Sequence, residues 1–215
     1  YVMDVSKYWK ERGPTYFQEL NEQPSYQKKR LLQQENFLLS HISDFKCKSI
    51  LEIGCGSGRY TKILSTKFKP ETYLAVDISQ GQIEKAREYV NDDKIEFVCA
   101  EIQNLKLDRK YDLVFAGEVL MHINFKDIEN VIQKMISYSK NKIINIDWYD
   151  ENNIGDVGLD YCFMHDYRTL FTKNCVKEFN MYKIPLSLKL KIINTYALLR
   201  KRTGIEQQCM TLVSI

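Results

Sequence analysis

The segment from Ile50 to Gly58, I-L-E-I-G-C-G-S-G, constrains the fold more than any other part of this chain. An apolar run that holds one acid, Glu52, leads into glycines at alternate positions, Gly54, Gly56 and Gly58, and a helical pattern follows. Glycine at this density is costly in chain entropy, so it is expected where other atoms must lie against the backbone. A helix that begins directly after such a turn offers free N–H groups and its positive dipole end. The sequence therefore predicts a strand, a ligand-binding turn and a helix.

A second acid lies where a nucleotide site needs one. Residues 72–76 read as a strand that ends in Asp77, nineteen residues after Gly58. An acid at the end of the second strand of a βαβ unit is placed to accept hydrogen bonds from ribose hydroxyls. The alternative is a carboxylate that only caps the following helix. Two acids on successive strands around a glycine turn favour the nucleotide site.

The spacing of the glycines distinguishes between kinds of nucleotide site. A dinucleotide-binding turn reads G-x-G-x-x-G and would need glycine at position 59, which holds Arg59. The pattern here is E-x-G-x-G-x-G, and with Asp77 it resembles the first motif of the class I S-adenosylmethionine-dependent methyltransferases. The resemblance covers about residues 49–148 with specific motifs, and it implies S-adenosylmethionine as the cofactor.

The same resemblance implies further cofactor contacts. Glu101, after the third strand, would accept from the adenine amino group, and the backbone N–H of Ile102 would reach the ring. The alternative for Glu101 is an exposed loop acid. Gly117 and Glu118, after the fourth strand, would lie beside the methionine part. The resemblance gives the cofactor site these residues: Glu52, Gly54, Gly56, Gly58, Asp77, Ile78, Glu101, Ile102, Gly117 and Glu118.

His122 is the candidate catalytic residue. It follows Glu118 by about one helical turn, and its ordinary pKa suits the removal of a proton from an attacking hydroxyl or amine. The alternative is a histidine that only packs at the cofactor pocket. We expect no metal site, because the cysteines show no C-x-x-C pair.

The candidate acceptor-binding residues come from three parts of the chain. Aromatic and basic side chains at helical spacing near the start could line a lid or belong to the core. Trp148 ends the fifth strand, and a polar and aromatic cluster follows at 165–168, where Asp166 is either a partner of Arg168 or a helix cap. The candidates are Trp9, Arg12, Tyr16, Trp148, His165 and Arg168.

The order of the patterns predicts the fold. Strand patterns at 49–53, 72–76, 95–99, 111–116 and 142–147 alternate with helical stretches at about 59–67, 80–91 and 125–138. This alternation is typical of a parallel sheet with helices on both faces. We expect an α/β, Rossmann-like three-layer sandwich with a mostly parallel seven-stranded sheet. The start should be helical, with breaks near Pro14 and Pro24, a further helix should span 166–179, and 189–200 and 206–214 should form a closing antiparallel hairpin that turns near Thr203-Gly204.

We therefore expect one methyltransferase domain over residues 1–215. It comprises an N-terminal helical lid segment (1–45), a cofactor-binding core (49–148) and an acceptor-side segment with the closing strands (149–215). The expected reaction is methyl transfer to an oxygen or nitrogen of a small polar acceptor, sugar-like or phosphorylated. The alternatives are an RNA methyltransferase and a non-catalytic cofactor-binding subunit.

Composition narrows the partners and the compartment. A net charge of +3 is too small for a dedicated nucleic-acid surface, which makes a nucleic-acid partner unlikely. No apolar run reaches the length of a membrane span. Six cysteines without a pairing pattern fit the reducing cytoplasm. The oligomeric state and the identity of the acceptor do not follow from the sequence, and the first residue, Tyr1, leaves the true N-terminus open.

Overall fold

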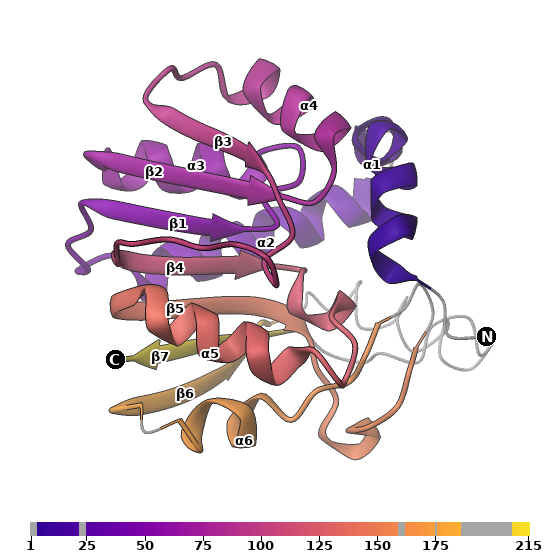
Figure 1. The fold of residues 1–215 in the computed structure, drawn as a ribbon, viewed down its shortest axis with the longest axis vertical. Helices are drawn as coiled ribbons and strands as arrows, with labels where there is room; N and C mark the ends of the chain where they lie inside the picture. The colour runs from indigo at the N-terminus through magenta and orange to yellow at the C-terminus, as the bar shows by residue number, and fades with distance from the viewer. Residues whose placement is uncertain (1–3, 22–24, 159–161, 175, 186–207) are drawn as a thin grey trace.

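The computed structural model describes residues 4–21, 25–158, 162–174, 176–185 and 208–215, and leaves the side chains at 14, 16–21 and 25–27 undescribed. A seven-stranded sheet in the order β3-β2-β1-β4-β5-β7-β6 forms its centre (Figure 1). The strands are β1 (Ser49–Ile53), β2 (Thr72–Asp77), β3 (Ile95–Cys99), β4 (Tyr111–Gly117), β5 (Ser139–Trp148), β6 (Glu178–Lys183) and β7 (Gln208–Ser214). The pairs among β1 to β5 are parallel, and β7 runs antiparallel between β5 and β6. The predicted fold class is confirmed.

Helices cover both faces of this sheet (Figure 1). The helices are α1 (Val5–Asn21), α2 (Ser25–His41), α3 (Arg59–Phe68), α4 (Gln80–Val90), α5 (Ile128–Tyr138) and α6 (Tyr167–Thr172), with short 3-10 turns η1 (Leu120–His122) and η2 (Glu151–Asn153). Apolar residues of α2, α3 and α4 form the core on one face, and those of α5 and α6 form the core on the other. Because it is covered on both faces, β1 is buried at every position, which explains its nearly continuous apolar sequence.

The N-terminal helices differ from the expectation. α1 runs through Pro14 without a break, although proline inside a helix removes one backbone hydrogen bond. The Pro24 position lies outside the described residues. Figure 1 places α1 beside the carboxyl ends of β1 to β4, where it also contacts α4. α1 therefore lies at the edge of the sheet where ligands bind in this class of fold.

The C-terminal third also differs in detail. The helix expected over 166–179 ends at Thr172, and Glu178–Lys183 forms strand β6. The partner of β7 in the antiparallel pair is this strand, with Phe179 opposite Val213. The expected strand at 189–200 and its turn near Thr203-Gly204 lie outside the described residues. The prediction of an antiparallel closing pair is confirmed, and among the described strands the pair is β6 with β7.

The part of the chain that the structure describes lacks two features. It holds no helix that is long and apolar enough to cross a bilayer. It also holds no group of three histidine, cysteine or acidic side chains that could bind a metal ion.

Candidate functional site

The glycine turn joins β1 to α3, and its three glycines serve different purposes. All three have positive φ, at 67° for Gly54, 54° for Gly56 and 90° for Gly58. A Cβ on Gly54 would lie 2.2 Å from the Val119 side chain, and one on Gly58 would lie 2.7 Å from that of Val90. A Cβ on Gly56 would meet nothing within 4 Å. Packing thus requires two of the glycines, whereas the third faces open space in which a ligand could lie against the backbone.

Asp77 holds this turn in place. Its Oδ2 accepts from the Gly56 N–H at 2.8 Å, and its Oδ1 accepts from the Ser79 N–H at 2.9 Å. Burial raises the pKa of Asp77, and the two backbone N–H groups oppose that rise. Each carboxylate oxygen has a second lone pair, so Asp77 can still accept from a ribose hydroxyl.

Glu52 is placed differently from the other acids. Its side chain is buried, and its Oε2 accepts from the hydroxyls of Thr61 at 2.6 Å and Tyr73 at 2.7 Å. Burial raises the pKa of Glu52 to about 7, although both hydroxyls lower it. These bonds tie β1 to α3 and β2 beneath the turn, so the structure gives Glu52 internal partners.

Glu101 follows β3 and lies under α1. Its Oε1 accepts from the Ser6 hydroxyl at 2.5 Å and from the Lys10 ammonium at 2.8 Å, and its Oε2 accepts from Asn104 at 3.1 Å. The Lys10 and Ser6 hydrogen bonds lower the pKa of Glu101, which keeps it ionised. The carboxylate expected to face adenine therefore also holds the N-terminal helix.

Two more contacts spread α1 over the same edge of the sheet. A Cβ on Gly13 would lie 2.0 Å from Ser79 Oγ, so the helix backbone rests directly on the residue that follows β2 by two positions. The Trp9 ring lies 4.8 Å from the ring of His122, centroid to centroid. Because α1 contacts residues after β2, β3 and β4, the structure gives it the place of a cover over the ligand-binding edge.

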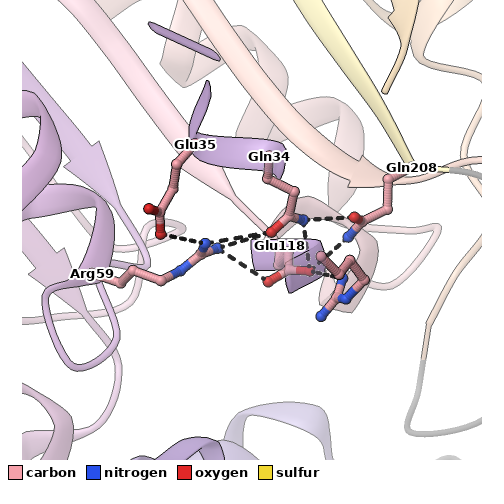
Figure 2. A network of polar contacts seen from close by, with 6 residues as sticks. Gln34, Glu35, Arg59, Glu118 and Gln208 are labelled. Carbon is pink, nitrogen blue, oxygen red and sulfur yellow. Dashed lines mark hydrogen bonds and ion pairs between the residues drawn. The ribbon is translucent and has the colours of Figure 1, made fainter. Parts of the chain in front are cut away.

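Glu118 lies after β4 in a polar network (Figure 2). Arg30 and Arg59 contact its carboxylate at 3.0 and 3.6 Å. Gln34 and Gln208 donate to Oε1 of the same carboxylate at 3.3 and 2.7 Å. Helix α2 supplies Arg30 and Gln34, and the first residue of β7 is Gln208, so three of these partners are far away in sequence. Glu118 was expected to contact the cofactor, and here its carboxylate binds protein donors.

Ile78, Ile102 and Gly117 are the other residues that were expected at the cofactor. Ile102 is buried in the core on the α5 face, and the carbonyl of half-buried Ile78 lies 3.5 Å from the Cys99 sulfur. A Cβ on Gly117 would lie 2.4 Å from the Tyr60 ring, so packing requires glycine there.

The cluster at 165–168 is not brought together as an acceptor site. His165 is buried, and its Nε2 lies 3.1 and 2.9 Å from the carbonyls of Leu120 and Ile123. Asp166 caps α6 by accepting from the Thr169 N–H at 3.0 Å. Arg168 is exposed on α6, and its guanidinium lies over the ring of Phe179 on β6. His165 thus supports the turn that carries His122, and Arg168 serves the outer surface.

The other acceptor-side candidates lie nearer the site. Arg12 lies over the rings of Tyr8 and Trp9, which places it on the covering helix. Tyr16 is on α1, and its side chain is undescribed. Trp148 ends β5 with the Arg30 guanidinium 5.2 Å from its ring centroid.

Sequence reasoning missed a buried acid on β5. Asp147 is 1% exposed and accepts from the Tyr167 hydroxyl at 2.8 Å. Burial raises its pKa to about 7, although the Tyr167 bond lowers it. The signal available in the sequence was an aspartate within an apolar strand pattern, directly before Trp148.

Comparison with known proteins agrees with this geometry. Residues 50–142 match the family model described as "Methyltransferase domain". A malonyl-[acyl-carrier protein] O-methyltransferase of Priestia megaterium is 36% identical over 92 residues, which are 43% of this chain and 33% of that protein. A phosphoethanolamine N-methyltransferase 1 of Arabidopsis thaliana is 32% identical over 108 residues, which are 48% of this chain and 21% of that protein. The chain thus spans about a third or less of these relatives.

Solved structures share the whole fold. The N-methyltransferase NodS of Bradyrhizobium japonicum, solved with S-adenosyl-L-homocysteine, superposes with a TM-score of 0.70 at 16% identity, over 98% of both chains. The magnesium protoporphyrin IX methyltransferase of Synechocystis, solved with S-adenosylmethionine, superposes with a TM-score of 0.71 at 13% identity, over 99% of this chain and 98% of that one. At these identities the match concerns the fold. Residues 50–142 thus form a methyltransferase domain, and the resemblance to the class I family is confirmed.

Proposed function

We propose that this chain, whose core is a class I methyltransferase domain, transfers the methyl group of S-adenosylmethionine to an oxygen or nitrogen of a small polar acceptor. The observation that carries the proposal is the open space at Gly56, whose N–H donates to Asp77, at the same edge of the sheet as Glu101 and under the covering helix α1. A nucleoside has hydroxyls for one acid and an amino group for the other. The donor set therefore fits the cofactor.

Different residues of the site contact different parts of the cofactor. The backbone at Gly56 lies against the ligand, Asp77 accepts from the ribose hydroxyls, and Glu101 accepts from the adenine amino group through Oε2. When bound, S-adenosylmethionine supplies a methyl group already activated by its sulfonium. The chain has to place the nucleophile in line with that methyl and to exclude water. Helix α1 excludes water by covering the edge of the sheet.

His122 is the proposed general base. It lies in η1, directly after β4, and Trp9 of the covering helix packs on its ring. A neutral imidazole there can take the proton that a hydroxyl or ammonium nucleophile loses on methylation. Buried His165 binds the carbonyls of Leu120 and Ile123 on either side of His122, and so fixes the turn that presents it.

We infer a small polar acceptor with an anionic group. The names of the two relatives state that one acts on a malonyl group and the other on phosphoethanolamine. Each of these acceptors carries an anionic group. The family match ends at residue 142, so it does not extend to the acceptor-side segment from 149 onward. The choice between the two acceptors, and between oxygen and nitrogen, belongs to experiment.

The test is the formation of S-adenosylhomocysteine by the purified chain with a panel of acceptors. The panel contains phosphoethanolamine, a malonyl thioester of acyl carrier protein, amino sugars and transfer RNA. Turnover with one of the first three supports the proposal, and turnover with RNA alone favours the RNA alternative. Folded protein that binds S-adenosylhomocysteine in calorimetry without any turnover favours the non-catalytic subunit. Folded protein that binds neither form of the cofactor contradicts the proposal altogether.

A further inference from the structure

Glu118 has an unusual backbone for its residue type. Its φ is +60°, in the left-handed region that favours glycine, and its N–H donates to the Ile146 carbonyl at 2.6 Å. Such a conformation persists only where the surroundings determine it, and it is most frequent at functional sites. Something in this structure therefore holds Glu118 in place.

The polar network of Figure 2 supplies that constraint. The Glu118 side chain is 22% exposed, and those of Arg30 and Arg59 are 14% and 21% exposed. Gln34 and Gln208 are fully buried, and Gln34 Nε2 donates to Gln208 Oε1 at 2.7 Å. Although burial alone would raise the pKa of Glu118, the two guanidinium groups hold it at about 2. One ionised carboxylate thus joins α2, α3, β4 and β7.

Each arginine leads from Glu118 to a different part of the site. Arg59 is the first residue of α3, directly after Gly58, and also contacts Glu35 at 3.3 Å. Its position fixes where the glycine turn ends. Arg30 contacts Glu118 at one side and lies over the ring of Trp148, at the end of β5. Its position fixes a wall on the acceptor side.

We propose that Glu118 is a positioning residue that couples the glycine turn to the Trp148 wall through Arg59 and Arg30. It acts through the arginines, so it needs no contact with the cofactor. The proposal rests on the proposed function, because it takes the glycine turn as the cofactor site. Its consequence is that a ligand at the turn changes the surroundings of Trp148, and that this change depends on the charge of Glu118.

The chain offers a direct reporter for this coupling. Its two tryptophans are Trp9 and Trp148. In a Trp9→Phe background all tryptophan fluorescence therefore comes from Trp148. Glu118→Gln keeps the size of the side chain and one acceptor oxygen but removes the charge. Glu35→Gln is the matched control, because it removes a carboxylate that contacts the same Arg59 while Glu118 stays in place.

Three measurements are made on each protein: Trp148 emission, its change on adding S-adenosylhomocysteine, and the affinity by calorimetry. We expect Glu118→Gln to shift the ligand-free emission, to weaken binding by about 2- to 30-fold, the range of coupled network residues, and to lose the ligand-induced change at saturation. Glu35→Gln should keep the ligand-induced change. Far-UV circular dichroism checks folding, and Arg30→Lys, which keeps the charge but loses the planar group, replaces Glu118→Gln if that variant does not fold.

The outcomes separate the two proposals. A ligand-induced change that survives in Glu118→Gln at saturation, or that Glu35→Gln loses equally, overturns the coupling. If the Trp9→Phe protein and the wild type both bind no S-adenosylhomocysteine, the proposed function fails. In that case the ligand-free emission still tests the link, and equal emission of Glu118→Gln and its parent refutes it.

Discussion

The contact between Lys10 and Glu101 predicts how firmly α1 covers the cofactor. Lys10→Ala removes the ammonium that lies 2.8 Å from Glu101 Oε1, while the Ser6 hydroxyl stays. The covering helix is then free to leave the edge of the sheet more often. We expect the cofactor to reach full affinity only in the covered arrangement, so its apparent affinity should fall with the covered fraction.

The size of the effect follows from exposure. The Lys10 and Glu101 side chains are 52% and 25% exposed, so the pair is screened by water and belongs with surface ion pairs of about 0.2–1 kcal/mol. We expect S-adenosylhomocysteine to bind about 1.5- to 5-fold more weakly, since 1.4 kcal/mol is about tenfold. Stopped-flow measurement should show a faster release of the ligand by a similar factor. The difference from wild type should shrink at about 1 M salt, where the screening length is about 3 Å.

The matched control is Lys7→Ala on the same helix. Lys7 lies 3.8 Å from Glu11 within the helix, and the two side chains are 70% and 69% exposed. Its loss should leave affinity and release unchanged. Equal effects of the two variants, or tighter binding by Lys10→Ala, would show that the helix does not cover the cofactor.

Three further predictions concern single residues. Asp77→Ala should weaken S-adenosylhomocysteine binding by about 1–3 kcal/mol in calorimetry, because it leaves the Gly56 N–H without its acceptor, and an unchanged affinity would remove Asp77 from the site. His122→Ala should lower turnover by ~10²–10⁴-fold with the affinity nearly intact, and near-normal turnover would mean that the nucleophile loses its proton without a base. Burial lowers the pKa of His165 to about 4 from 6.5, so the unfolded chain binds the extra proton between these values. Urea titrations give the unfolding free energies of the wild type and of His165→Gln, and the wild-type value minus the variant value should therefore fall by up to roughly 3 kcal/mol as pH drops through that window. A pH-independent difference would contradict the burial of a neutral His165.

Much of the cofactor half could be predicted from local sequence. The strands at 49–53 and 95–99 have the bounds that the pattern indicated. The first is buried at every position and reads as an apolar run between turns, whereas the second, at the edge of the sheet, alternates buried Ile95 and Phe97 with exposed Glu96. The glycine turn was predictable for a different reason. Positive φ and close contacts leave few alternatives to glycine at Gly54 and Gly58, so the residue type reports the backbone directly.

The C-terminal strand was missed although its signal was present. Residues 178–183 read E-F-N-M-Y-K, and Phe179 and Met181 alternate with polar residues, as in a strand with one buried face. The helical pattern that starts at Tyr167 concealed this change of period. The helix stops after Thr172, which is too short for a periodic pattern to mark its end.

The roles of site residues depended on partners that sequence distance conceals. Glu118 was placed correctly after the fourth strand, but its donors Arg30 and Gln208 come from positions 88 and 90 residues away. His165 was singled out for its residue type, and its burial against the Leu120 carbonyl gives it a supporting place instead. Such assignments need the tertiary structure, because the same residue types occur on surfaces and in cores.

The position of β7 has a consequence for the order in which this chain can mature during synthesis. Strand β7, which comes last among the strands that the structure describes, lies inside the sheet between β5 and β6. Among the described strands, β6 therefore has no partner until residues 208–214 have left the ribosome. Strands β1 to β5 pair with one another without it, and N-terminal parts generally fold first during translation. Gln208 begins β7 and donates to Glu118, so the same late event completes the contacts of that carboxylate. A nascent chain can therefore form the glycine turn well before it can form the finished acceptor side.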